Sequence, residues 1–375
     1  MKISVCIPCY NVENYIGECL ESLLNQTLKE IEIICVDDCS TDRTLAILTR
    51  YAKCHNNIKV YRNLFNSKLI QTRKVALSHA FGNYIMFVDS DDILERNACE
   101  IAYNAIVKNN SDIVEFNCKQ IDINGKEINE DKSYCNLIEG KLAGDAIFEN
   151  FKNNKIGQML WNKIYKSDII KSAYLQISFS RLYYKEDVFL TSIIYNNIKS
   201  YYGIPDKLYK YRFHSGQSRA SNITLEQFKD RCKCADIISD MIKCFYSQSD
   251  LTLLQLQMIK SKMNNWLKNS NLEELLKHKG EDGFDDYLTV FINAWINNEL
   301  YDRLQYINNE DIKDIYYTQL RLVLECLHTI YEQCGSEVIK DNKAAQNLCN
   351  RFSACKKYNI DSIIKNINND IDWRS

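Results

Sequence analysis

The chain has 375 residues, and its 47 lysine and arginine residues nearly balance its 49 aspartate and glutamate residues, so the net charge is −2. This length suits one large or two ordinary globular domains, and the near-neutral charge excludes a general basic field for binding nucleic acid. No apolar run reaches the roughly 18 to 20 residues of a membrane span, and the first residues hold too short an apolar stretch for a signal peptide. We therefore expect a cytoplasmic protein with at most peripheral contact with the inner face of the membrane.

The 16 cysteines are spread along the whole chain. Because no export signal is predicted, we expect free and often buried thiols instead of a disulfide framework. Cys6 and Cys9, in "CIPC", have the spacing of a redox or zinc site, but no second C-x-x-C pair follows. A metal role for this pair stays open as an alternative.

Strand-like and helix-like patterns alternate along the amino-terminal part of the chain. Each of the first three β-rich runs is followed by a segment in which apolar residues recur at helical spacing. The expected strands are residues 3–7, 31–38, 58–63 and 83–89, and the expected helices are residues 12–28, a segment after "CSTDRT" that ends near residue 54, and residues 71–81. This alternation predicts an α/β fold with a mostly parallel sheet and helices on both faces.

Carboxylates gather where these predicted strands end. Residues 37–38 follow the second strand, and Asp89, Asp91 and Asp92 follow the fourth, in "IMFVDSDD". In sheets of this kind, ligands bind beyond the carboxyl ends of the strands. Two carboxylates separated by one residue can share a hard divalent cation with the oxygens of a diphosphate. The alternative is a solvated turn in which Asp91 or Asp92 caps a helix that begins near Leu94.

Beyond residue 95 the pattern becomes mixed. We expect a helix near residues 95–109, a strand near residues 112–117 and a hairpin or loop at "DINGKEINEDK". After about residue 225 the sequence consists of long helical patterns. The only proline after Pro8 is Pro205, so no Pro/Gly-rich linker separates the two parts.

This change of pattern predicts two domains. The first, residues 1–222, is the α/β domain, and the second, residues 223–375, is all-helical. The apolar stripes of the second domain are wide enough to need burial, and the polar sides of its helices mix acids with bases. We expect this domain to pack against the first domain, or against a second copy of itself in a homo-oligomer, rather than to anchor the chain in a membrane.

Four motifs occur along the chain in the order "CIPCYNVENYI", "EIICVDDCSTDRT", "QTRKVALSHAFGNYIMFVDSDDIL" and "YKEDVFL". Taken together they resemble the family 2 glycosyltransferases, over residues 1 to about 220. The resemblance implies a Rossmann-like GT-A fold and a metal-dependent hexosyltransferase. This enzyme would use Mn²⁺ or Mg²⁺ at a D-x-D motif and a nucleotide-sugar donor, expected to be a UDP-sugar, and would invert the anomeric carbon. The implied acceptor is a glycan or a lipid-linked acceptor in bacterial surface polysaccharide or lipooligosaccharide synthesis.

Carried over position by position, the resemblance also assigns a site. The residues expected to bind the donor are Pro8, Tyr10, Glu13, Asp38, Arg73, Asp89, Arg212 and Arg219, the last two through the phosphates. The expected metal ligands are Asp91, Asp89 and His214. Asp37 is expected to be structural. Trp161 and Lys163 match a position near the acceptor cleft, although a tryptophan there is equally typical of a core. Where the family usually has a glycine and "ARN", this chain reads "NSKLIQTRK".

The last of the four motifs, "YKEDVFL", is the second acidic motif and would supply a base. An inverting transfer needs one base that takes the proton of the acceptor hydroxyl on the face of the sugar opposite the leaving group. The resemblance assigns this role to Asp187, with Glu186 beside it. Simpler explanations stay open: Asp187 as a helix-start carboxylate, Arg73 as an exposed helix arginine, and His214 as a solvated loop residue.

Three other functions stay open. A phosphatase can use a D-x-D strand end, but that motif normally lies near the amino terminus with Thr or Val following, and here Ile93 follows. A sugar-phosphate nucleotidyltransferase of similar topology would open with a Gly-rich phosphate loop, and "IPCYNVEN" has no glycine. The presence of both acidic motifs argues against a non-catalytic module that binds sugar nucleotides or glycans.

Overall fold

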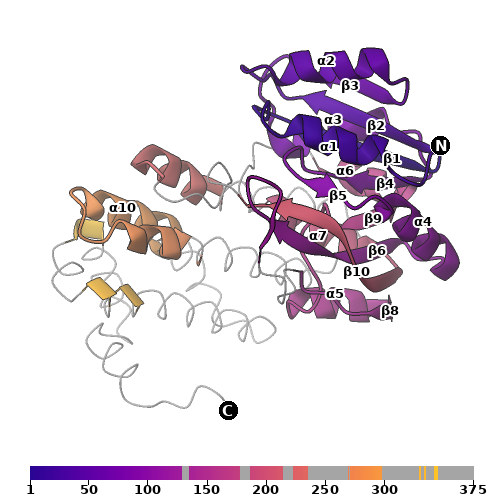
Figure 1. Cartoon of the computed structure of the whole chain (residues 1–375). Helices are drawn as coiled ribbons and strands as arrows, with labels where there is room; N and C mark the ends of the chain where they lie inside the picture. Colours follow the sequence, from indigo (N-terminus) through magenta and orange to yellow (C-terminus); the bar gives the residue numbers. More distant parts are fainter. Residues whose placement is uncertain are drawn as a thin grey trace. The chain divides into compact units, whose positions relative to one another are not determined.

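The computed structural model divides the chain into two units, Met1–Arg219 and Ala220–Ser375 (Figure 1). The residues that the structure describes are 1–128, 135–177, 186–213, 223–234, 269, 271–297, 329–330, 333–334 and 342–344.

The first unit is built on a 10-stranded mixed sheet with the order β3-β2-β1-β4-β9-β6-β10-β5, in which β7 pairs with β6 and β8 with β10. The strands are β1 (Ile3–Cys9), β2 (Ile31–Asp37), β3 (Ile58–Arg62), β4 (Tyr84–Phe87), β5 (Ile93–Leu94), β6 (Ile113–Ile121), β7 (Glu127–Ile128), β8 (Gly140–Ala143), β9 (Lys163–Lys166) and β10 (Ser200–Arg212). Strands β1 to β4 pair in parallel, as do β6 and β10, whereas β9 runs antiparallel between β4 and β6. The predicted mostly parallel sheet is therefore confirmed, with antiparallel strands added on one side.

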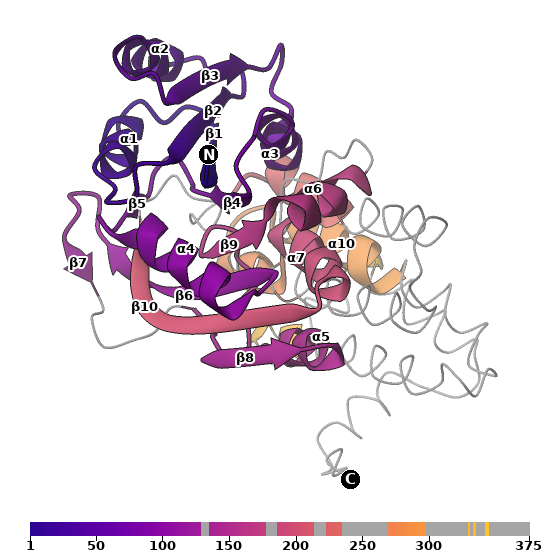
Figure 2. The same cartoon turned by 90° about the vertical axis from the view of Figure 1, so that its right-hand side faces the viewer.

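Helices cover both faces of this sheet. They are α1 (Ile16–Leu24), α2 (Thr44–Cys54), α3 (Lys68–Ser78), α4 (Ala98–Asn109), α5 (Asp145–Lys152), α6 (Ser167–Leu175) and α7 (Glu186–Asn197). Figure 2 shows α1 and α2 on one side of strands β1 to β3, and α3 and α6 on the other. Because parallel strands must be joined by crossovers, α1, α2 and α3 each return the chain to the same end of the sheet and so align the carboxyl ends of β1, β2 and β4.

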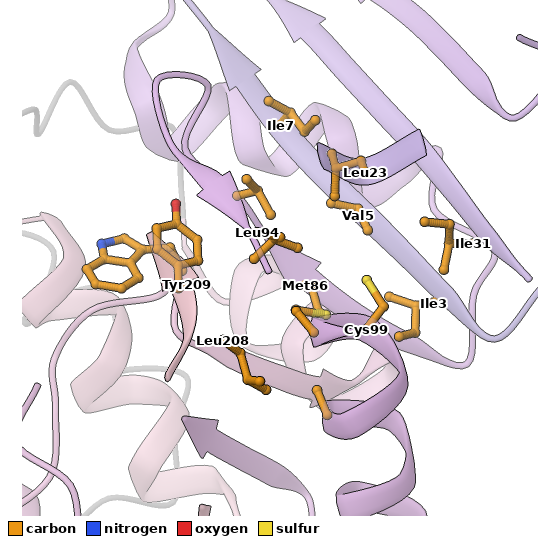
Figure 3. Close-up of a cluster of buried hydrophobic side chains, with 14 of the residues drawn as sticks. Ile3, Val5, Ile7, Leu23, Ile31, Met86, Leu94, Cys99, Leu208 and Tyr209 are labelled. Carbon is orange, nitrogen blue, oxygen red and sulfur yellow. The ribbon is translucent and has the colours of Figure 1, made fainter. Parts of the chain in front are cut away.

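One buried cluster of the first unit joins the sheet to α1 and α4. Every residue of β1 and of β2 is buried. Ile3, Val5 and Ile7 point to one face of β1, since side chains alternate along a strand. They belong to one buried cluster with Leu23 of α1 and Leu94 of β5 (Figure 3). Burying an aliphatic side chain of this size contributes roughly 1.5 to 3 kcal/mol to the free energy of unfolding. This cluster therefore stabilises the central strands whose carboxyl ends carry the candidate residues.

The approach of β4 to β1 requires a glycine. A Cβ atom at Gly82 would lie 2.5 Å from the backbone nitrogen of Ser4 and 2.7 Å from the carbonyl carbon of Ile3, so a side chain does not fit there. The Gly82 N–H donates to Ser4 Oγ (2.7 Å), which in turn donates to the buried Glu32 carboxylate (2.6 Å). These contacts set β4 in register beside β1, just before the chain reaches the aspartates that begin at Asp89.

The chain after β4 differs from the expected helix. Residues Ile93–Leu94 form β5, which pairs antiparallel with β10, and the helix begins only at Ala98. The helix-cap explanation for Asp91 and Asp92 is therefore wrong. The expected hairpin is confirmed, because β6 and β7 pair antiparallel.

The cysteines within the described residues are free thiols, and most of them are buried, as expected. Cys6 and Cys9 both lie on β1. Side chains three residues apart on a strand point to opposite faces. A shared redox or zinc role for this pair is therefore wrong.

The described residues of the second unit include helices and no strand. Helix α10 (Phe284–Phe291) continues into a π-helical turn, η1 (Ile292–Asn297). Leu275 and Leu288 are fully buried, and the buried Glu274 carboxylate forms an ion pair with Arg231 Nη1 (3.6 Å). In neither unit does a described helix have the length and apolar character needed to span a membrane.

Candidate active site

The first predicted donor-binding residues lie at the carboxyl end of β1. Pro8 is buried in the strand opposite Val36 of β2, and Tyr10 follows the strand with 46% of its surface exposed. The Glu13 carboxylate accepts a hydrogen bond from Arg43 N (2.9 Å) and forms an ion pair with Arg43 Nε (3.1 Å). These bonds tie the loop after β1 to the start of α2 and leave Tyr10 as an exposed aromatic surface at the sheet edge.

The two aspartates at the carboxyl end of β2, Asp37 in the strand and Asp38 directly after it, are both buried. Asp37 forms an ion pair with Arg62 Nε (3.3 Å), which fits the structural role expected for it. The Asp38 carboxylate accepts hydrogen bonds from Ser67 N (2.8 Å), Lys68 N (2.9 Å) and Asn63 Nδ2 (2.7 Å). Because a carboxylate offers about four acceptor positions, the loop before α3 already uses most of the bonding capacity of Asp38.

Three residues in these loops have left-handed backbone conformations, namely Asn11 (φ 53°), Cys39 (φ 63°) and Lys68 (φ 67°). Such conformations cost on the order of 1–3 kcal/mol each, so surrounding bonds must hold them. Asn11 Oδ1 accepts from Thr41 N (2.9 Å), and Lys68 N donates to Asp38 (2.9 Å). Strain of this kind is typical of ligand-binding loops.

The acidic loop, Asp89–Asp92, follows β4 and is held by the end of β10. The Asp89 N–H donates to the Tyr209 hydroxyl (3.0 Å), and that hydroxyl donates to Asp92 Oδ2 (2.7 Å). Arg212 N donates to Asp92 Oδ1 (2.7 Å), and Arg212 Nε donates to the Asp91 carbonyl oxygen (2.8 Å). Asp92 is thus a buried anchor of the loop, because donors from β10 satisfy its carboxylate.

The acidic loop concentrates like charge in a poorly solvated place. Burial raises the pKa of Asp92 well above its usual value, and the charges of Asp91 and Asp89 raise it further. Burial also raises the pKa of Asp89, although the Arg73 guanidinium opposes this effect. A divalent cation would relieve the repulsion, and carboxylate oxygens are ligands that Mg²⁺ and Mn²⁺ prefer. Within the described residues, which do not include His214, no three His, Cys, Asp or Glu side chains form a metal-binding group.

Arg73, on α3, joins the acidic loop to the second acidic motif. Its side chain is only 3% exposed, so the explanation as an exposed helix arginine is wrong. Its Nη2 lies 3.0 Å from Asp89 Oδ1, and its Nη1 lies 3.9 Å from Glu186 Oε1. Nε and Nη1 of Arg73 are buried and have no hydrogen-bond partner in the described part of the chain. Arg73 therefore keeps donor capacity inside the site.

Glu186 and Asp187 form the first turn of α7. Burial raises the pKa of Glu186 to about 8, and the Asp187 charge contributes to this shift. The Asp187 carboxylate accepts from the Val188 N–H (2.8 Å), and its charge also raises the pKa of Asp89. The structure therefore brings together both acidic motifs, which are nearly a hundred residues apart in the sequence. The helix-start location is equally compatible with the structural explanation of Asp187.

Arg212 lies in a different setting from the one expected. Its side chain is 1% exposed, and its guanidinium donates to the carbonyl oxygens of Asp91 and Ile123 (2.8 and 2.9 Å) and to the Glu18 carboxylate. This geometry does not favour direct pairing with a diphosphate, because protein acceptors already occupy the guanidinium. The other two residues expected near the phosphates, His214 and Arg219, lie outside the described residues.

Comparison with known proteins identifies the family to which this domain is related. Residues 4–179 match the family model described as "Glycosyl transferase family 2". Residues 4–179, which lie within the first unit, therefore form a domain of glycosyl transferase family 2. Its mostly parallel sheet with helices on both faces is the GT-A fold expected for this family.

Several members of the family are similar to this chain. Glycosyltransferase GlyA of Streptococcus pneumoniae is 31% identical over 225 residues, which are 57% of this chain and 31% of GlyA. The poly(ribitol-phosphate) beta-glucosyltransferase of Bacillus spizizenii is 43% identical over 152 residues, which are 38% of this chain and 24% of that protein. The chain therefore spans about a third or less of the length of these two relatives. Among solved structures, S. aureus TarS 1-349 in complex with UDP-GlcNAc has a TM-score of 0.56 at 25% identity, covering 85% of this chain and 90% of that one.

Two residues of this glycosyltransferase site were not predicted from the sequence. Tyr209 holds the acidic loop, and Glu18 contacts the arginine that anchors it. Tyr209 could have been found, because Tyr209 and Tyr211 alternate with polar residues and so predict an aromatic strand face. Trp161 stacks on both of these rings (centroids 4.4 and 5.4 Å apart) and is 6% exposed, which supports its core explanation. No sequence pattern points to Glu18.

Proposed function

We propose that this protein is an inverting glycosyltransferase that moves a sugar from a nucleoside-diphosphate donor, a UDP-sugar, to a hydroxyl group of a glycan or lipid-linked acceptor in surface polysaccharide or lipooligosaccharide synthesis. The observation that carries this proposal is Arg73, which lies between Asp89 (3.0 Å) and Glu186 (3.9 Å) and so unites the two acidic motifs in one site. The similarity to TarS, a protein solved with UDP-GlcNAc, supports UDP as the nucleotide.

In this proposal residues 1–222 form the catalytic domain and residues 223–375 a helical domain that packs against it or forms a homo-oligomer. Because the donor is a nucleotide sugar, the proposal also includes a cytoplasmic location, at or near the inner face of the membrane. The relatives support the proposed class of acceptor, because one of them is a poly(ribitol-phosphate) beta-glucosyltransferase.

The nucleoside would lie against the loops after β1 and β2. Pro8, Tyr10 and Glu13 would form the first loop, with the exposed Tyr10 ring available for stacking on the base. The loop before α3 leaves part of the hydrogen-bond capacity of the Asp38 carboxylate unused, and with this capacity Asp38 would accept a hydrogen bond from the base edge. Asp89 would contact the ribose, and the buried donors of Arg73 would face the donor sugar and phosphates.

Asp91 and Asp89, with His214, would hold Mn²⁺ or Mg²⁺. When bound, this cation supplies Lewis-acid stabilisation of the leaving diphosphate. Arg219 would add a bidentate contact to the phosphates.

The transfer itself needs one base. The acceptor oxygen forms a bond to the anomeric carbon while the bond from that carbon to the diphosphate oxygen breaks on the opposite face, and the acceptor proton passes to the Asp187 carboxylate. Glu186 lies beside this base, and its raised pKa of about 8 keeps it protonated at neutral pH, so it adds no second charge to the site.

The test is release of nucleoside diphosphate from a panel of nucleotide sugars in the presence of candidate acceptors. Asp187→Asn should lower turnover by on the order of a hundredfold while donor affinity stays nearly unchanged. The matched control is Asp168→Asn, because Asp168 is also an acidic residue in a first helical turn, that of α6, but is exposed. Loss of donor affinity at unchanged turnover would place Asp187 in the donor pocket and refute the base assignment.

A further inference from the structure

The end of β10 holds the acidic loop at several points. The Tyr209 hydroxyl accepts from Asp89 N (3.0 Å), and Tyr209 and Arg212 N both bond the Asp92 carboxylate (2.7 Å each). The Arg212 side chain bonds the Asp91 carbonyl oxygen (2.8 Å). Asp91 is thus flanked by anchored residues, and its own backbone is fixed by the guanidinium of Arg212.

The same guanidinium binds two further segments of the chain. Nη1 donates to the carbonyl oxygen of Ile123 (2.9 Å), in the β6–β7 hairpin, and Nη2 donates to the Glu18 carboxylate of α1. The guanidinium also lies over the ring of Tyr15, 5.4 Å from its centroid. A buried guanidinium needs a counter-charge, and Glu18 supplies it from a side chain that is 59% exposed.

We propose that Arg212 and Glu18 act as a positioning pair that sets the orientation of the acidic loop, and that Arg212 is not a ligand of the donor diphosphate. The inference rests on the proposed function for its catalytic consequence. Its structural basis is independent of that function: Glu18 orients the guanidinium, the guanidinium fixes the Asp91 carbonyl, and the fixed backbone sets the direction in which the Asp91 side chain leaves the loop. Sites of this kind require their groups to be held within about 0.5 Å.

The first measurement uses the full chain without ligand. Hydrogen exchange of a peptide that contains the acidic loop should become at least about fivefold faster in Glu18→Gln than in the wild type, because the guanidinium then loses its charged partner. Arg212→Gln should accelerate exchange further, and the double variant should match Arg212→Gln, because the two residues act through one contact. Glu18→Gln keeps the test decisive even if Arg212→Gln folds poorly, since Glu18 is half-exposed.

The matched control is Glu21→Gln. Glu21 lies on the same helix, but its carboxylate accepts from the Tyr51 hydroxyl (2.9 Å) on α2. This variant should leave exchange of the acidic loop unchanged. Equal exchange of the loop in Glu18→Gln and the wild type would overturn the proposal.

The second measurement compares the affinities for UDP and for uridine in the presence of a chelator. A positioning residue leaves the ratio of the two affinities unchanged in Arg212→Gln, whereas a diphosphate ligand lowers it about tenfold or more, which would also overturn the proposal. If the wild type binds neither compound even when Mn²⁺ replaces the chelator, the UDP-sugar assignment of the proposed function fails, while the exchange measurement still decides the positioning role.

Discussion

The buried ion pair between Lys163 and Glu115 offers a demanding test of the fold. Both side chains are 0% exposed, and Lys163 Nζ lies 2.9 Å from Glu115 Oε1. The carboxylate also accepts from the Tyr201 hydroxyl (2.9 Å) and from Asn162 Nδ2 (3.1 Å). Lys163→Met keeps most of the apolar stem but removes the charge, so Glu115 is left buried without a cation.

Removal of one partner from a buried ion pair costs about 3–5 kcal/mol. The lower value applies here, because the Tyr201 hydroxyl and Asn162 Nδ2 continue to donate to Glu115. The Tyr195 hydroxyl lies 3.3 Å from the same carboxylate, but its single proton has a nearer acceptor in the Gly157 carbonyl oxygen (3.0 Å). A loss of about 3 kcal/mol lowers the melting temperature of a domain of this size by about 6–12 °C. The loop that carries Asn162 and helix α7, which carries Tyr195, should loosen together.

Thermal unfolding followed by circular dichroism at neutral pH measures this loss. The double variant Glu115→Gln with Lys163→Met should recover most of the melting temperature, because a neutral amide needs no counter-charge. Lys2→Met is the control: Lys2 and Glu30 lie at the same distance, 2.9 Å, but are 36% and 55% exposed, so this substitution should cost less than about 1 kcal/mol. The melting temperature changes by about 2–4 °C per kcal/mol in a domain of this size. A Lys163→Met protein that melts within about 2 °C of the wild type would therefore refute the reasoning.

Three further predictions follow from other parts of the first unit. Asp91→Ala should abolish nucleoside diphosphate release with the fold intact, and excess chelator should stop the wild type; full turnover in chelator would contradict this. Because the pKa of Glu186 is raised from 4.5 to about 8, the folded protein keeps a proton that the unfolded chain releases, so the free energy of unfolding should fall as the pH rises from about 5 to about 8. Melting temperatures at both ends of that window should differ less in Glu186→Gln. Gly82→Ala should destabilise by about 1–3 kcal/mol, since its Cβ would lie 2.5 Å from a backbone nitrogen. Gly17→Ala, whose nearest atom would be 3.8 Å away, should stabilise by about 0.5–1 kcal/mol.

The alternation of strands and helices could be predicted because it depends on local periodicity. The expected strand at residues 31–38 corresponds to β2 (Ile31–Asp37), and the expected strand at residues 58–63 corresponds to β3 (Ile58–Arg62). Helix α3 begins at Lys68, three residues before the expected start. The reason is a contact distant in sequence, since the Lys68 N–H is held by the Asp38 carboxylate. Local spacing carries no information about such a partner.

The function of individual charged residues was harder to predict for the same reason. Arg73 was expected to face the donor and Arg212 to bind its phosphates, and both are buried. Nε and Nη1 of Arg73 have no hydrogen-bond partner in the described residues, whereas the donors of Arg212 reach the Glu18 carboxylate and three carbonyl oxygens, those of Asp91, Asp122 and Ile123. Sequence motifs identify residue types at a site, but the number of acceptors left over by the fold decides which arginine can meet a ligand.

The acidic loop shows how a chain can place three carboxylates at the end of a buried strand. Asp89 is paired with a guanidinium from α3, and Asp92 is bonded by a hydroxyl and an N–H from β10. These contacts offset part of the repulsion between the carboxylates, and they come from elements 16 residues before and about 120 residues after the loop. Asp91, between them, is half-buried, and its backbone carbonyl oxygen accepts a hydrogen bond from Arg212 Nε (2.8 Å). A substitution at the end of β10 should therefore change the behaviour of the acidic loop without touching any of its residues.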